Sequence, residues 1–167
     1  MVSSFGRIVC LVLIGYFSTN EVYIAKVDAL VPPRYGTPVN NAVAKQIAAG
    51  AIDHAKENSW NVAVAVVDTH GMLIYYEMMD DTQTGSSTIC IEKAKSSAQF
   101  RRPTKAFEEG INNGRTAILS FGINMCEGGL PIVNEGKVIG GIGVSGVNSD
   151  QDASCAEAGL TRLLSDN

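Results

Sequence analysis

The sequence has 167 residues, of which 46% are hydrophobic and 18% charged, and its formal net charge is -4. A chain of this size and composition forms one globular domain with a substantial core, and it is not intrinsically disordered. A negative net charge without a long basic run does not provide a phosphate-neutralising surface, so we expect no nucleic-acid partner.

The N-terminal residues have the pattern of an export signal. Ile8–Phe17 (IVCLVLIGYF) is uncharged, too short to span a bilayer comfortably, and of the length of a signal-peptide core. Val27 and Ala29 provide the small or aliphatic residues of a cleavage position. We expect a signal peptide over residues 1–29 and a domain over residues 30–167. The mature protein would then be secreted or periplasmic, with no stable membrane span; an uncleaved anchor and a cytosolic extension are the alternatives.

The first half of the domain predicts a helix and a hairpin. Apolar residues at helical spacing predict a helix over Val39–Asn58, with Thr37 as N-cap and Pro38 in the first helical position. Asn61–Asp68 is a nearly continuous apolar run and predicts a central strand. Met72–Asp80 follows a short turn and predicts its antiparallel partner.

The second half predicts two helices, a second hairpin and a last helix. The expected elements are helices over Ser86–Phe100 and from Pro103 to about Asn112, strands over Leu130–Val133 and Lys137–Ser145, and a helix over Ser149–Leu164. The intervening residues 115–129 predict either a strand or a long loop. Because both strand pairs are joined by tight turns, we expect an α+β protein with an antiparallel sheet rather than a doubly wound parallel sheet.

Three glycines in the last strand region have the spacing of a dinucleotide-binding loop. Gly141, Gly143 and Gly146 spell G-x-G-x-x-G, but the first two lie within a predicted strand and too little chain follows for a βαβ unit. We therefore expect these glycines to permit close approach by a helix, another subunit or a flat ligand.

Three stretches together resemble a known family. They are VAVAVVDTHGMLIYYEMMD (residues 62–80), KAKSSAQFRRPT (93–104) and GGLPIVNEGKVIGGIGVSGVNSDQDASCAEAGL (128–160). Over residues 38–165 the chain resembles the GlcG/HbpS-like family, also called DUF336, which includes haem-binding HbpS-type proteins and C-terminal domains of cobalamin adenosyltransferases. The resemblance implies a profilin-like fold, with a five-stranded antiparallel sheet and helices on both faces, and a homo-oligomer. It also implies haem or a related flat tetrapyrrole as ligand, in storage or sensing.

The candidate haem ligand is His54, at the edge of the apolar stripe of the first predicted helix. An imidazole that opens onto an apolar cleft is suited to bind haem iron, whereas a partly buried histidine with one backbone hydrogen bond is the alternative. His70, in the turn of the first hairpin, is a weaker candidate and is expected to be exposed.

The remaining cofactor-binding candidates are Arg101, Arg102, Asp68, Gly128 and Gly129. The two arginines could pair with haem propionates or another carboxylate, or they could form interhelix salt bridges. Asp68 could bind a ligand or cap the turn. A cleft near Arg101, Asp68, Gly128 and Gly129 is also the basis of an alternative function, an enzyme or accessory protein that acts on a small organic acid or oxidised metabolite.

The sequence contains no nucleophile elbow and no metalloprotease or redox-cysteine motif, so it leaves enzymatic activity undecided. Asp152 is expected to cap the last helix, and with Gln151 it could touch a ligand. Cys126 and Cys155 could form a bridge in an oxidising compartment, or remain apolar thiols.

Overall fold

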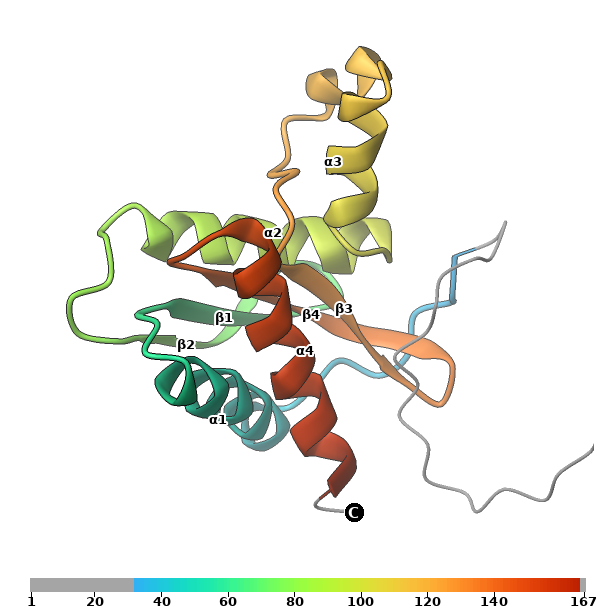
Figure 1. Cartoon of the computed structure of the whole chain (residues 1–167). Helices are drawn as coiled ribbons and strands as arrows, with labels where there is room; N and C mark the ends of the chain where they lie inside the picture. The colour runs from blue at the N-terminus through green and yellow to red at the C-terminus, as the bar shows by residue number, and fades with distance from the viewer. Residues whose placement is uncertain (1–31, 166–167) are drawn as a thin grey trace, which may run out of the picture.

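The structure, a computed structural model, describes residues 32–165, so the predicted signal peptide lies outside the described residues. This part of the chain forms an antiparallel sheet with helices on both faces (Figure 1). Its elements are α1 (Asn41–Glu57), β1 (Ala63–Asp68), β2 (Leu73–Met78), α2 (Ser86–Phe100), α3 (Lys105–Asn112), the 3-10 helix η1 (Thr116–Phe121), β3 (Gly129–Asn134), β4 (Lys137–Ser145) and α4 (Ser149–Ser165). The α+β class is therefore confirmed. No helix in this range is long and apolar enough to cross a bilayer.

The central strand β1 contributes to a core on each side of the sheet. The strand order is β2-β1-β4-β3, and every pair of neighbours is antiparallel. Val64 and Val66 pack on the side covered by α1 and α4, whereas Ala63, Ala65 and Val67 pack against α2. Alternate residues of a strand point to opposite faces, which explains why this run is apolar at nearly every position.

The sheet has four strands in the described residues, so the expectation of five is wrong. Outside the four strands, one isolated parallel bridge joins Tyr35 to Val138 at the start of β4. There the N–H of Gly36 donates to the Val138 carbonyl at 2.8 Å. Proline cannot donate to a ladder, and the nearby Pro33 and Pro38 limit this segment to a short contact. The profilin-like assignment stays a prediction.

The start of α1 also differs from the prediction. Asn40 is the N-cap, and its side chain accepts from the N–H of Val43 at 2.9 Å. Thr37 and Pro38 precede the helix because the chain is still extended there, with the Val39 N–H donating to Ile139. A better capping side chain three residues later thus sets the start of the helix.

The segment that the sequence left undecided contains the 3-10 helix η1 and a loop, with no strand between residues 115 and 128. Together with α3, η1 projects from the end of α2 as an arm (Figure 1). An aromatic cluster holds the base of this arm: Phe100 meets Phe107 edge-on at 5.4 Å and stacks on Phe121 at 5.7 Å between ring centroids.

Hydrogen bonds outside the ladder occupy part of each sheet edge. On β3, Thr104 binds both backbone groups of Gly129, and Pro131 has no N–H. On β2, the carbonyl of Ile74 accepts from the side chain of Asn41.

The strand glycines allow α2 to lie directly on the sheet. A Cβ at Gly141 would be 2.5 Å from the carbonyl oxygen of Ala94, and one at Gly143 would collide with the carbonyl oxygen of Cys90. Gly141 and Gly143 therefore reflect close approach by a helix, the first of the three possibilities expected from the sequence, whereas Gly146 lies against the backbone of Asn61 and Val62.

Candidate functional site

The candidate site is a hollow where α1 and α4 cross. Gly50 permits the close crossing, because a Cβ there would be 3.1 Å from the Cα of Gly159. Beside the crossing lies an open hollow of about 410 Å³, whose lining includes Asp53, His54 and Glu57 from α1, and Ala158, Thr161 and Arg162 from α4. Its volume is within the range of small-molecule sites.

His54 is half-buried at this hollow, and two side chains hold its ring. Its Nε2 lies 2.9 Å from Oγ of Ser154 on α4. The indole of Trp60 meets the imidazole edge-on, with 6.0 Å between ring centroids. The hydrogen-bond partner of Nε2 is therefore a side chain from another helix, whereas the alternative expected from the sequence was a backbone group.

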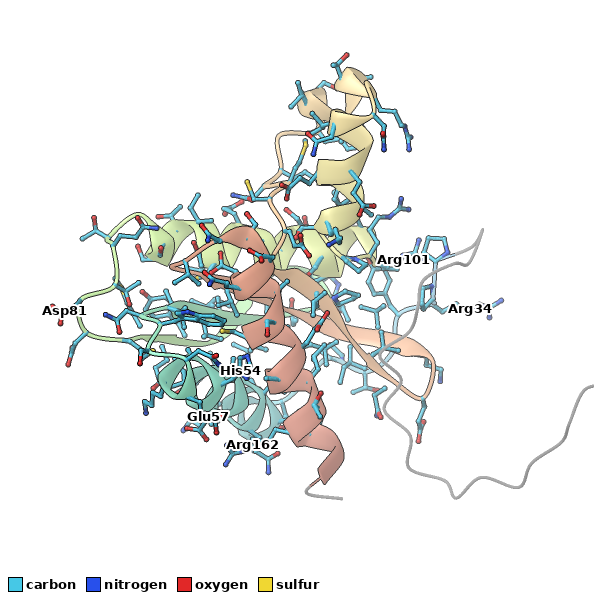
Figure 2. The ribbon with its side chains drawn as sticks, in the orientation of Figure 1. Arg34, His54, Glu57, Asp81, Arg101 and Arg162 are labelled. Atoms are coloured by element: carbon cyan, nitrogen blue, oxygen red, sulfur yellow. The ribbon has the colours of Figure 1, made fainter. Side chains whose placement is uncertain are left out.

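Charged groups surround the imidazole. Arg162 forms an ion pair with Asp53 across the crossing, and Glu57 lies one helical turn beyond Asp53. Figure 2 shows His54, Glu57 and Arg162 together where α1 and α4 meet. An imidazole, a guanidinium and carboxylates side by side can bind a metal centre and a carboxylate of the same ligand.

A second polar cluster, Lys93 and Asp152, is enclosed on the α2 side. The Nζ of Lys93 lies 2.7 Å from Oδ2 of Asp152, and the two side chains are 2% and 3% exposed. The ammonium also donates to the Val144 carbonyl at 3.0 Å, and Asp152 accepts from the Val147 N–H at 3.2 Å. Burial raises the pKa of the Asp152 carboxyl above its ordinary value, and the Lys93 ammonium acts in the opposite direction.

Gly128 and Gly129 cover this ion pair. A Cβ at Gly128 would be 2.8 Å from Nζ of Lys93, and one at Gly129 would collide with the Lys93 carbonyl. Lys93 was not predicted as a site residue, although its position three residues after Cys90 puts it on the buried stripe of α2. A buried lysine requires an acidic partner, so a lysine within an apolar helical stripe could have predicted a buried ion pair from the sequence. Asp152 is that partner, and its carboxylate also accepts from the N–H of Val147, which precedes α4 in the chain.

Arg101 and Arg102 contact groups of their own chain. Nη1 of Arg101 donates to the Pro33 carbonyl at 3.0 Å, and its guanidinium lies 5.1 Å from the ring centroid of Tyr35. Nε of Arg102 donates to the Phe100 carbonyl at 3.3 Å.

Asp68 and His70 belong to the hairpin turn. Oδ1 of Asp68 accepts from the N–H groups of His70 and Met72, at 2.8 and 2.9 Å. This is the turn-capping arrangement considered from the sequence. The His70 side chain is 80% exposed.

The structure does not bring all the candidates into one site. His54 lies on the α1 side of the sheet, whereas Arg101 lies at the end of α2 on the opposite side (Figure 2). Arg102 is close in sequence to Thr104, which binds Gly129 through backbone and side chain. Gly129 is thus linked to the segment that follows Arg102, and Gly128 lies against Lys93 and Asp152.

The described cysteines are all free thiols, so the Cys126–Cys155 bridge is absent from this structure. Burial raises the pKa of the Cys90 thiol to about 12 and that of the Cys155 thiol to about 11. A high pKa leaves little thiolate, so these two thiols are poor nucleophiles.

Comparison with known proteins identifies the relatives of this chain. Residues 39–161 match the family described as "Haem degrading protein HbpS-like". Protein GlcG of Escherichia coli (strain K12) is 40% identical over 108 residues, which cover 64% of this chain and 81% of GlcG.

Solved structures show the same fold. A double mutant of Streptomyces reticuli HbpS superposes with a TM-score of 0.70 at 26% identity, covering 83% of this chain and 97% of that chain. The PduOC:Heme complex has a TM-score of 0.69 at 23% identity, covering 75% of this chain and 95% of that chain. With the match over residues 39–161, these findings show that the chain belongs to the HbpS-like family.

Proposed function

We propose that this protein binds haem, or a related flat tetrapyrrole, at the hollow between α1 and α4, with His54 as the axial ligand. The observation that carries the proposal is the half-buried imidazole of His54 at this hollow. Histidine is a common axial ligand of haem iron, and a single imidazole is sufficient because the porphyrin supplies the equatorial nitrogens. Bound haem would supply a redox-active iron with an intense Soret absorption band.

Two other residues of the hollow suit such a ligand, whereas Asp53 and Glu57 place carboxylates beside it. Arg162 is a planar guanidinium of the kind that binds carboxylates such as the propionates. Ala158 has a small side chain beside His54, whereas the space over Gly50 is filled by Arg162 and Gly159 of α4. Arg101 and Arg102 lie on the other side of the sheet, so any carboxylate that they bind is separate from one held beside His54.

The comparisons support this choice of ligand. The family description names haem, and PduOC was solved as a complex with haem. The organic-acid alternative relies on Asp68 and Arg101, and each of these side chains binds backbone groups of its own chain. Because Arg162 of the hollow is also paired, with Asp53, it is the family description and the PduOC:Heme complex that make the haem proposal the stronger of the two.

We also propose that the protein is exported and acts as a homo-oligomer in haem storage or sensing. The uncharged apolar run at residues 8–17 supports export. Fractionation of expressing cells tests the location, and light scattering of the purified chain tests the assembly. Recovery of full-length protein in the cytosol would contradict export, and a monomeric mass would contradict the assembly.

Titration of the purified full chain with hemin, followed at the Soret band, tests the haem proposal. We expect the wild type to shift the band, His54→Ala to lose the shift, and His70→Ala to behave like the wild type. His70 is a suitable control because it is the other histidine of the sequence and is exposed in a turn. Equal binding by His54→Ala would overturn the ligand assignment, and no binding by the wild type would overturn the ligand class.

A further inference from the structure

Ser154 lies against the atom of His54 that would bind a metal. Its Oγ is 2.9 Å from Nε2, although the two residues are 100 positions apart in the sequence. The glycine crossing of α1 and α4 brings them together, and the edge contact with Trp60 further restricts the ring. No pattern in the sequence predicted a role for Ser154.

This hydrogen bond makes Nε2 unavailable as a ligand in either neutral tautomer. If Nε2 is unprotonated, the Ser154 hydroxyl donates to the lone pair that a metal requires. If Nε2 carries the proton, it donates to Oγ and has no lone pair to offer. In both cases the contact between His54 and Ser154 must open before Nε2 can bind iron.

We propose that Ser154 is a positioning residue that holds His54 in a closed, haem-free state and thereby sets the affinity of the site for haem. The inference rests on the proposed function, because it concerns the same imidazole. When the contact opens, the serine keeps its proton and turns to water, and the Nε2 lone pair becomes available to the iron. A proton on Nε2 moves to Nδ1 through solvent, so the ring stays neutral.

The size of the effect follows from a thermodynamic cycle. The hydrogen bond exists in the haem-free state and is lost on ligation, so its net free energy is subtracted from that of binding. A typical net hydrogen-bond contribution corresponds to a change of about fivefold in the dissociation constant. Removal of the hydroxyl should therefore tighten hemin binding by about fivefold.

Hemin titration of the full chain with four variants tests the proposal. Ser154→Ala should bind about fivefold more tightly than the wild type. Ser154→Thr, the matched control that keeps the hydroxyl, should bind like the wild type. His54→Ala should not bind, alone or combined with Ser154→Ala.

A measurement without hemin tests the hydrogen bond itself. In ¹⁵N spectra of the full chain at alkaline pH, Ser154→Ala should shift the Nε2 resonance of His54, and Ser154→Thr should leave it close to its wild-type position. An unchanged resonance in Ser154→Ala would overturn the inference.

The two proposals fail in different ways. If hemin binds, His54→Ala abolishes binding and Ser154→Ala binds no more tightly than the wild type, the role of Ser154 is overturned and the proposed function stands. If neither the wild type nor Ser154→Ala binds hemin, both are overturned.

Discussion

The two faces of the sheet are packed in different ways. On the α2 face, glycines bring the helix backbone onto the strand backbone, and the enclosed Lys93 and Asp152 neutralise each other. On the α1/α4 face, aliphatic side chains separate helices from strands, and the crossing of α1 and α4 leaves a hollow. Under α2 the helix and strand backbones are in direct contact, whereas the crossing of α1 and α4 has the hollow beside it. The α2 face is therefore constrained by packing, and the candidate binding site lies on the α1/α4 face.

The strongest test of this comparison is the removal of the buried cation. Lys93→Met leaves the Asp152 carboxylate enclosed without its partner, which should lower the free energy of unfolding by about 3–5 kcal/mol. Urea unfolding followed by the fluorescence of Trp60 measures this loss. Lys95→Met is the control, because Lys95 pairs with Glu92 on the exposed side of the same helix. Equal losses in the two variants would show that enclosure of the pair does not matter.

The same variant should respond to acid in a distinctive direction. Burial already raises the pKa of Asp152, and loss of the Lys93 ammonium should raise it further. The folded state then binds a proton at a higher pH than the unfolded chain, so the free energy of unfolding of Lys93→Met should increase as the pH falls through that range. Unfolding of Lys93→Met at pH 7 and pH 5 measures the recovery. Lys93→Met combined with Asp152→Asn removes the titrating group, so a recovery in that double variant would contradict the assignment.

A smaller loss is expected when the backbone contact under α2 is disturbed. Gly143→Ala places a methyl group against the Cys90 carbonyl, and the resulting shift of the helix should cost about 2–3 kcal/mol. Gly85→Ala is the matched control, because a Cβ at Gly85 meets no atom within 4 Å and its φ is -62°. Thermal or urea unfolding of the two variants compares them directly. A neutral Gly143→Ala would show that α2 can move away from the sheet.

The smallest effect is expected on the opposite face. Asp53→Asn removes the carboxylate that pairs with Arg162, but both side chains are substantially exposed. Water and salt weaken such pairs, so the loss should remain below about 1 kcal/mol at low salt and become smaller at high salt. A loss as large as that of Lys93→Met would show that the two faces depend on ion pairs to the same degree.

The sequence predicted the elements of the fold better than their contacts. Periodicity identified the order of helices and hairpins, and the misplaced glycine spacing correctly excluded a nucleotide loop. Sequence patterns did not predict contacts between residues that are far apart in the chain. Lys93 and Asp152 are 59 residues apart, and His54 and Ser154 are 100 residues apart. A helical pattern shows which side of a helix is buried, but it does not show which residues of another helix lie opposite.

The same reason explains the smaller errors. The fifth strand was implied by resemblance and not by a β-type run in this chain. Ile89 is apolar yet exposed, because α2 presents Cys90, Lys93 and Ala94 to the sheet, and the apolar pattern alone does not distinguish the two sides. Thr37 satisfied the local preference for a helix N-cap, but backbone bonding to β4 keeps that segment extended.

The occupied edges of the sheet restrict how copies of the chain can associate. Thr104 holds both backbone groups of Gly129, Pro131 offers no donor, and Asn41 occupies the carbonyl of Ile74. An incoming strand would therefore meet an interrupted ladder on either side, which is how natural sheets avoid growing into aggregates. Assembly without sheet extension would have to use side-chain surfaces on the helices or the projecting arm. Such surfaces can associate reversibly, whereas open strand edges can lead to irreversible aggregation.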